Sequence, residues 1–127
     1  ARHTPVDTLM AMHSVGVVPY YAKRACIDMW GLNDKVIART PIEPNPTALI
    51  GHQRSNPGYV FSRNPDIYIP EEDWLILDDL EQPVEAGFPT DFTDNYMSVS
   101  IPLGASFMNI WVRKDFARDT FRMNVEG

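Results

Sequence analysis

The sequence contains only one cysteine among its 127 residues. A single thiol excludes an internal disulfide and a cysteine-rich zinc site. Ala25 and Ile27 flank Cys26, which favours a small buried side chain over a catalytic thiol. A reactive thiol would need a base and an exposed turn beside it. We therefore expect no cysteine chemistry.

Long hydrophobic runs are also missing. No apolar run approaches the roughly 20 residues that a membrane helix requires, so we expect this chain to contain no membrane span. Residues 1–8 are polar and lack the apolar core of a signal peptide. Because the sequence starts at Ala1 without a methionine, we expect a domain excised from a longer protein.

Positive charge is scarce and scattered. Eleven Lys and Arg stand against 17 Asp and Glu, and the net charge of −6 argues against a nucleic-acid surface. No glycine-rich phosphate loop follows Gly16, and Ser14 and Ser62 lack the flanking glycines of a nucleophile elbow. The three histidines show none of the short spacings typical of metal sites. The sequence thus predicts no cofactor, no metal site and no catalytic residue.

The remaining composition is that of an ordinary globular protein. Hydrophobic residues make up 44% and charged residues 22%, which predicts one α/β domain over residues 1–127. The short apolar runs Thr8–Met12 and Ala25–Met29 predict buried parallel strands. Between them, Ser14 is expected to cap a helix over Val15–Ala22. These segments form a βαβ unit.

The middle of the chain alternates helix and strand signals. In chain order it predicts a helix from Asn33 or Asp34 to about Thr40, a helix over residues 57–63 capped by Asn56, and a strand over Asp66–Pro70. The run Trp74–Leu77 fits a strand or a helix, and residues 78–95 are interpreted mostly as surface loop.

The end of the chain predicts a hairpin. Tyr96–Leu103 and Phe107–Lys114 flank a three-residue loop over 104–106, and a short helix is expected over Asp115–Met123. The predicted fold is a small Rossmann-like three-layer domain. Its mixed sheet has about five strands and ends in the C-terminal antiparallel hairpin.

Polar side chains follow the predicted parallel strands, at the edge where ligands gather in open α/β sheets. Carboxylates and amides bind sugar hydroxyls, and aromatic rings lie on the apolar face of a sugar. The candidate substrate-binding residues of this edge are His13, Tyr20, Tyr21, Asp28, Asn33, Asp34 and His52.

Several of these residues also have a purely structural interpretation. Asp28 is expected mainly to accept backbone N–H bonds from the turn at Gly31 and Leu32. Asn33 or Asp34 can serve as a helix cap. Both interpretations explain the residues without any ligand.

Some of these motifs also resemble a known family. The chain resembles the C-terminal soluble domain of bacterial polytopic membrane glycosyltransferases of the arabinofuranosyl- and mannosyltransferase type. The resemblance rests on Gly16-x-x-Pro19-Tyr20-Tyr21, Asp28-x-x-Gly31-Leu32-x-Asp34-x-x-Ile37-Ala38, residues 51–54 (Gly-His-Gln-Arg), residues 59–66 (Tyr-Val-Phe-Ser-Arg-Asn-Pro-Asp) and the segments 99–103 and 110–114.

The resemblance implies a parent enzyme that takes a sugar from a polyprenyl-phosphate donor, with its catalytic acid in a membrane loop outside this chain. It places the domain on the periplasmic or extracytoplasmic face of a bacterial inner membrane. Gln53 stands where many relatives of that family carry an acid, so the loop around it is not expected to be catalytic.

Three functions are compatible with these observations. The first is a non-catalytic accessory domain that helps to bind or orient a glycan acceptor. The second is a structural domain that packs on the transmembrane part of the same protein or on a partner. The third is a free-standing enzyme that uses the polar cluster at the strand ends.

Overall fold

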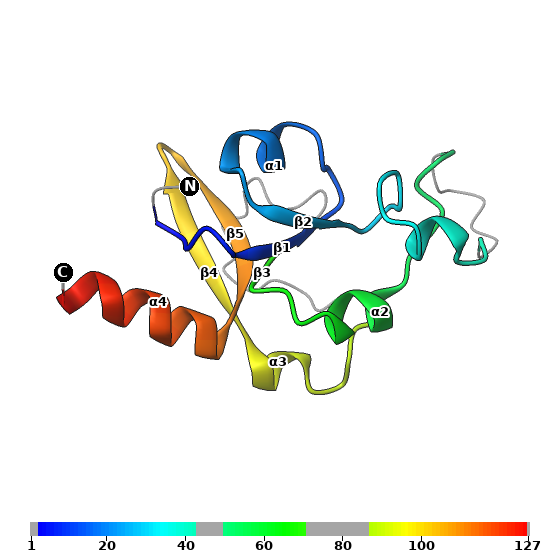
Figure 1. The fold of residues 1–127 in the computed structure, drawn as a ribbon. Helices are drawn as coiled ribbons and strands as arrows, with labels where there is room; N and C mark the ends of the chain where they lie inside the picture. Colours follow the sequence, from blue (N-terminus) through cyan, green and yellow to red (C-terminus); the bar gives the residue numbers. More distant parts are fainter. Residues whose placement is uncertain (1–2, 43–49, 71–86, 127) are drawn as a thin grey trace.

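The fold is built around one sheet of five strands in the order β2-β1-β3-β5-β4. The computed structural model describes residues 3–42, 50–70 and 87–126 (Figure 1). The strands are β1 (Leu9–Met12), β2 (Ala25–Asp28), β3 (Ile67–Ile69), β4 (Tyr96–Leu103) and β5 (Ser106–Arg113). β1 pairs parallel with both β2 and β3, whereas β5 pairs antiparallel with β3 and β4. The predicted mixed sheet with a C-terminal antiparallel hairpin is confirmed.

Short helices cover both faces of this sheet. They are α1 (Val17–Ala22), the 3-10 helix η1 (Ile37–Arg39), α2 (Pro57–Ser62), α3 (Phe92–Asn95) and α4 (Lys114–Glu126). Within the described ranges, no helix is long and apolar enough to cross a membrane.

Alternating side chains divide the core into two layers. On β3, Tyr68 faces one cluster, whereas Ile67 and Ile69 face the other. The first cluster is completed by side chains from η1, α2 and α3, among them Ile37, Val60 and Phe92. The second is completed by side chains from α1 and α4, among them Val18, Ala22, Phe116 and Ala117. Since helices lie on both faces, the domain has the three layers predicted for a Rossmann-like fold.

Several helix boundaries differ from the prediction. Ser14 does not cap α1, because the cap position is Gly16 and no side chain bonds there. The helix expected to reach Thr40 is only the single 3-10 turn η1. α4 is longer than predicted and extends to Glu126. By contrast, Asn56 caps α2 as predicted, since its Oδ1 accepts a bond from the backbone N–H of Tyr59 at 3.1 Å.

The hairpin loop and the stretch before it also differ. Leu103 pairs with Ser106, so the loop has two residues, Gly104 and Ala105, rather than three. Gly104 has a φ of +67°, which glycine adopts without strain. The helix α3 lies in a stretch interpreted as loop. Trp74–Leu77 and residues 78–86 lie outside the described residues.

Candidate functional site

β1, β2 and β3 run parallel, so their carboxyl ends lie at one edge of the sheet. Three rings from separate segments meet there, and we call them the three-ring stack: His13 after β1, Trp30 after β2 and His52 in the loop before α2. The rings of Trp30 and His52 lie face to face, with centroids 3.5 Å apart and planes 11° apart. The ring of His13 lies on Trp30 at 5.5 Å and a tilt of 57°.

The structure therefore brings the predicted residues His13 and His52 together through a residue that the prediction omitted. Trp30 is half-buried, as is His52, whereas only 7% of His13 is exposed. His13 also lies against Tyr68, with ring centroids 6.4 Å apart. The position of Trp30 in the sequence could have identified it as a site residue. It lies two residues after the end of β2, in the turn where the sequence predicts polar side chains.

Asp28 lies beside this stack and is fully occupied by the backbone. Its Oδ1 accepts bonds from the N–H groups of Trp30 at 3.0 Å and Gly31 at 3.1 Å. Its Oδ2 accepts a bond from the N–H of Asn33 at 2.7 Å. Only 2% of Asp28 is exposed. The geometry agrees with the structural interpretation of Asp28, since the carboxylate fixes the turn that carries Trp30.

Asp34 is occupied in a similar way. Its Oδ1 accepts bonds from the N–H groups of Val36 at 2.9 Å and Ile37 at 3.1 Å, at the start of η1. Its Oδ2 accepts a bond from the hydroxyl of Tyr59 at 3.1 Å and lies 3.7 Å from Nη1 of Arg63. This carboxylate therefore ties η1 to α2. The neighbouring Asn33 is exposed.

Tyr20 and Tyr21 form a separate pair on α1. Their rings meet edge to face at 5.2 Å, and 76% and 73% of the two residues are exposed. In the part of the chain that the structure describes, no ring contact joins this pair to the three-ring stack. The two tyrosines therefore form an exposed aromatic surface of their own.

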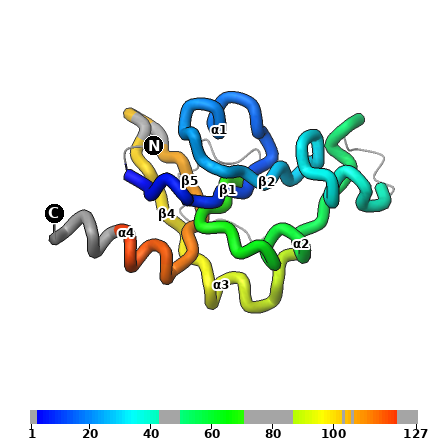
Figure 2. Tube along the Cα trace, viewed as in Figure 1, coloured from blue at the N-terminus to red at the C-terminus, as the bar shows by residue number. Residues whose placement is uncertain are grey.

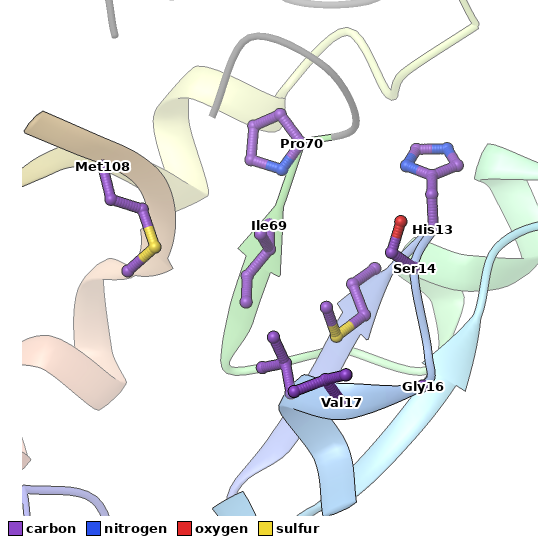
Figure 3. A pocket seen from close by; sticks show the side chains of 9 residues that line it. His13, Ser14, Gly16, Val17, Ile69, Pro70 and Met108 are labelled. Atoms are coloured by element: carbon purple, nitrogen blue, oxygen red, sulfur yellow. The ribbon is translucent and has the colours of Figure 1, made fainter. Parts of the chain in front are cut away.

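A pocket of about 520 Å³ lies between α1 and the second core layer, next to His13 (Figure 3). Its lining residues are Met12, His13, Ser14, Gly16, Val17, Val18, Ile69, Pro70 and Met108. The walls are aliphatic or thioether side chains, and His13 and Ser14 are the polar lining residues. Such walls suit an aliphatic group better than a sugar, which needs several polar partners.

The tyrosine, arginine and aspartate of residues 59–66 have structural partners as well. Tyr59 and Arg63 belong to the Asp34 contact described above. Asp66 accepts a bond from the N–H of Leu9 at 2.7 Å and pairs with Arg113 at 2.9 Å. Asp66 therefore connects the starts of β1 and β3 with the end of β5, at the edge opposite the three-ring stack.

Cys26, the one thiol of the chain, is held in its protonated form. Burial, and after it the charge of Asp28, raises the pKa of the Cys26 thiol to about 12. Among the described residues, no group of three or more His, Cys, Asp and Glu side chains is arranged to hold a metal ion. The arrangement can bind a ligand through rings and exposed polar groups.

We expect Cys26 to react slowly with alkylating reagents. Because its pKa is about 12, the thiol is almost fully protonated near neutral pH, and its reactivity rises only in the alkaline range. At about pH 8, alkylation by iodoacetamide should be at least about a hundredfold slower in the folded protein than in urea. Mass spectrometry of timed samples measures both rates. Cys26 is half-buried, and equal rates would contradict a thiol held in its protonated form.

The comparisons with known proteins give one match. A family model described as a domain of unknown function (DUF8728) matches residues 1–122. No curated protein matches the chain, and no solved structure matches it either.

Proposed function

We propose a function for this chain, which belongs to the DUF8728 family of domains of unknown function: it is a non-catalytic domain that binds a glycan at the edge carrying the three-ring stack. The observation that carries the proposal is a contrast between the carboxylates and the aromatic rings at this edge. The carboxylates of Asp28 and Asp34 are taken up by backbone and tyrosine donors, whereas Trp30 and His52 remain partly accessible.

A half-exposed ring stack is a suitable surface for a sugar. The apolar face of a pyranose or furanose packs on an aromatic ring, and its hydroxyls need a few well-placed polar groups. Asn33 is exposed in the same turn, and its amide can both donate and accept hydrogen bonds. This pairing of rings and amide supports recognition rather than turnover.

The finer proposal is that the domain is an accessory part of a membrane glycosyltransferase that uses a polyprenyl-phosphate sugar donor. In that setting the domain helps to bind or orient the glycan acceptor on the extracytoplasmic face of a bacterial inner membrane. This step is supported by the sequence resemblance alone. The engaged carboxylates agree with catalysis elsewhere in the parent protein.

A second candidate function is a structural domain that packs on the transmembrane part of the same protein or on a partner. It is favoured by α1, which contains no buried residue and exposes Val17, Tyr20 and Tyr21. If this function holds, substitutions of the two tyrosines should weaken assembly and leave glycan binding at the three-ring stack unchanged.

Chemical-shift mapping with arabinan and mannan oligosaccharides tests the glycan proposal. We expect shifts at Trp30, Asn33 and His52, and His52→Ala should weaken binding by about tenfold because it removes one ring of the stack. His3→Ala is the matched control, since His3 is an exposed histidine that precedes the start of β1, whereas His13 and the stack lie after its end. Shifts confined to Tyr96–Lys114, or none at millimolar ligand, would contradict the proposal.

A further inference from the structure

The two segments that contain Trp30 and His52 project beyond the carboxyl end of β2, as Figures 1 and 2 show in cyan to green. We call the described residues 30–42 and 50–56 the edge lobe. Its two segments are held together by bonds from Arg54 Nε to the carbonyl oxygen of Thr40 at 3.1 Å and from Asn56 Nδ2 to Thr40 Oγ1 at 3.3 Å. The two described segments of the lobe are therefore joined by side-chain contacts.

Aliphatic side chains are exposed on the edge lobe. Leu32 is 68% exposed and Ile50 is 95% exposed, and Val36 and Ile42 are also exposed. The same turns bury Ile37 completely and fix Gly31 against η1. The exposed side chains thus extend from a packed base, and their exposure in water is costly unless something covers them.

Positive charge accompanies these aliphatic residues. Lys35 and Arg39 are exposed on the lobe, whereas its aspartate, Asp34, is mostly buried and engaged. The asymmetry extends to the whole chain. Residues 1–63 hold seven Lys and Arg against four Asp and Glu, and residues 64–127 hold four against thirteen.

The exposed hydrophobic residues follow the same division. Of the ten large hydrophobic side chains exposed in the described ranges, eight lie in the more basic part, residues 1–63. The other two are Met97 and Phe107, on the hairpin β4–β5. On the edge lobe, exposed aliphatic residues therefore lie together with exposed cations, a combination that a negative surface attracts.

We infer that the edge lobe docks on the surface of an anionic lipid bilayer. Leu32, Val36, Ile42 and Ile50 would enter the boundary between headgroups and acyl chains, and Lys35 and Arg39 would contact lipid phosphates. A protein partner fits less well, because lysine is depleted in protein interfaces, whereas Lys35 is exposed between the exposed aliphatic side chains of Leu32 and Val36.

Docking in this way is independent of glycan binding, although both involve the edge lobe. The contacts with lipid come from exposed aliphatic residues and cations, and the contacts with sugar come from the rings of Trp30 and His52. A docked domain would hold its ring stack close to the lipid surface. Each activity can therefore be lost without the other.

Co-sedimentation with vesicles tests the inference. The protein is mixed with vesicles of phosphatidylcholine alone, or of phosphatidylcholine with an equal part of phosphatidylglycerol. We expect binding to the anionic vesicles only, and a decrease of that binding as salt is added. The double variant Leu32→Asp/Ile50→Asp should lower the partition coefficient at least about tenfold. The double variant Lys35→Glu/Arg39→Glu should do the same.

The double variant Met97→Asp/Phe107→Asp is the matched control. It places the same two charges at exposed hydrophobic residues of the hairpin, so binding should stay within about twofold of the unsubstituted protein. All these positions are exposed, and an unchanged melting temperature checks each fold. Equal binding to both vesicle types, or none to either, would overturn the inference. So would a dimer in analytical ultracentrifugation that Leu32→Asp/Ile50→Asp dissociates, because a second copy would then cover the lobe.

Discussion

Replacing Gly31 by alanine is expected to lower the free energy of unfolding by about 3–5 kcal/mol. Gly31 has a φ of +77°, where a residue with a Cβ is strained. A Cβ at this position would also lie 2.6 Å from the backbone nitrogen of Ala38 and 2.9 Å from the carbonyl carbon of Ile37. Because both atoms belong to the backbone of η1, the clash can be relieved only by moving η1 away from the turn.

Gly51→Ala provides a matched control for this substitution. Gly51 also has a positive φ, of +91°, but no atom of the described residues lies within 4 Å of a Cβ built there. For this variant, the free energy of unfolding should fall only by the cost of the strained φ, roughly 1–2 kcal/mol. Urea denaturation of both variants measures the difference. Equal losses would mean that the close approach of the Gly31 turn to η1 contributes nothing beyond the strain at φ.

Movement of η1 should also disturb the candidate site. Gly31 lies next to Trp30, and its N–H donates to Asp28. We therefore expect Gly31→Ala to change the near-ultraviolet circular dichroism of the Trp30–His52 stack as well as stability. The control at Gly51 lies beside His52 but requires no displacement of backbone.

The sheet could be predicted from the sequence because its signals are local. The runs at residues 8–12, 25–29 and 66–70 are short and apolar, and each became a strand shorter by one or two residues. The hairpin was predicted from two flanking apolar segments around Gly104. The loop length was wrong by one residue because it depends on the pairing of Leu103 with Ser106, which composition does not specify.

The helix after Asp34 shows where local signals become insufficient. Asp34 accepts bonds from the N–H groups of Val36 and Ile37, but the cap position of η1 is Val36, so the predicted cap is wrong by two residues. The extent of the helix was wrong at its start, because residues 35 and 36 form a turn and only Ile37–Arg39 is helical. Thr40, where the predicted helix ends, is extended and accepts bonds from Arg54 and Asn56, which lie 14 and 16 residues away, beyond the reach of a capping rule.

The same distinction applies to the candidate site. The role of Asp28 followed from chemistry within five residues, since its partners are the N–H groups of residues 30, 31 and 33. The three-ring stack joins residues 13, 30 and 52, and no spacing rule relates these positions. Topology predicted that His13 and His52 would share an edge, and only the structure identifies Trp30 as the ring between them.

The role of Asp28 gives the second large prediction. Asp28→Asn should lower the free energy of unfolding by about 2–3 kcal/mol. The amide oxygen of asparagine can still accept the bonds from Trp30 and Gly31. Its NH₂ group would then face the N–H of Asn33, which now donates to Oδ2 at 2.7 Å. Two donors would meet at a position where only 2% of the residue is exposed.

Asp34→Asn makes the same chemical change in a setting that tolerates it. The amide oxygen can accept the bonds from Val36 and Ile37, and the NH₂ group would face the hydroxyl of Tyr59, which can accept a hydrogen bond. We expect a loss below about 1 kcal/mol for this variant, including the weak contact with the exposed Arg63. Thermal and urea unfolding measure the loss of stability in both variants, and we expect the larger loss for Asp28→Asn.

The result for Asp28 also bears on function. A structural carboxylate predicts that Asp28→Asn weakens glycan binding only as far as it loosens the turn carrying Trp30 and Asn33. Binding measured well below the melting temperature of the variant should then be reduced by less than about fivefold. An unchanged melting temperature combined with complete loss of glycan binding would reverse the assignment. Asp28 would then be a ligand-binding carboxylate, and its three backbone bonds would orient it toward the sugar rather than stabilise the turn.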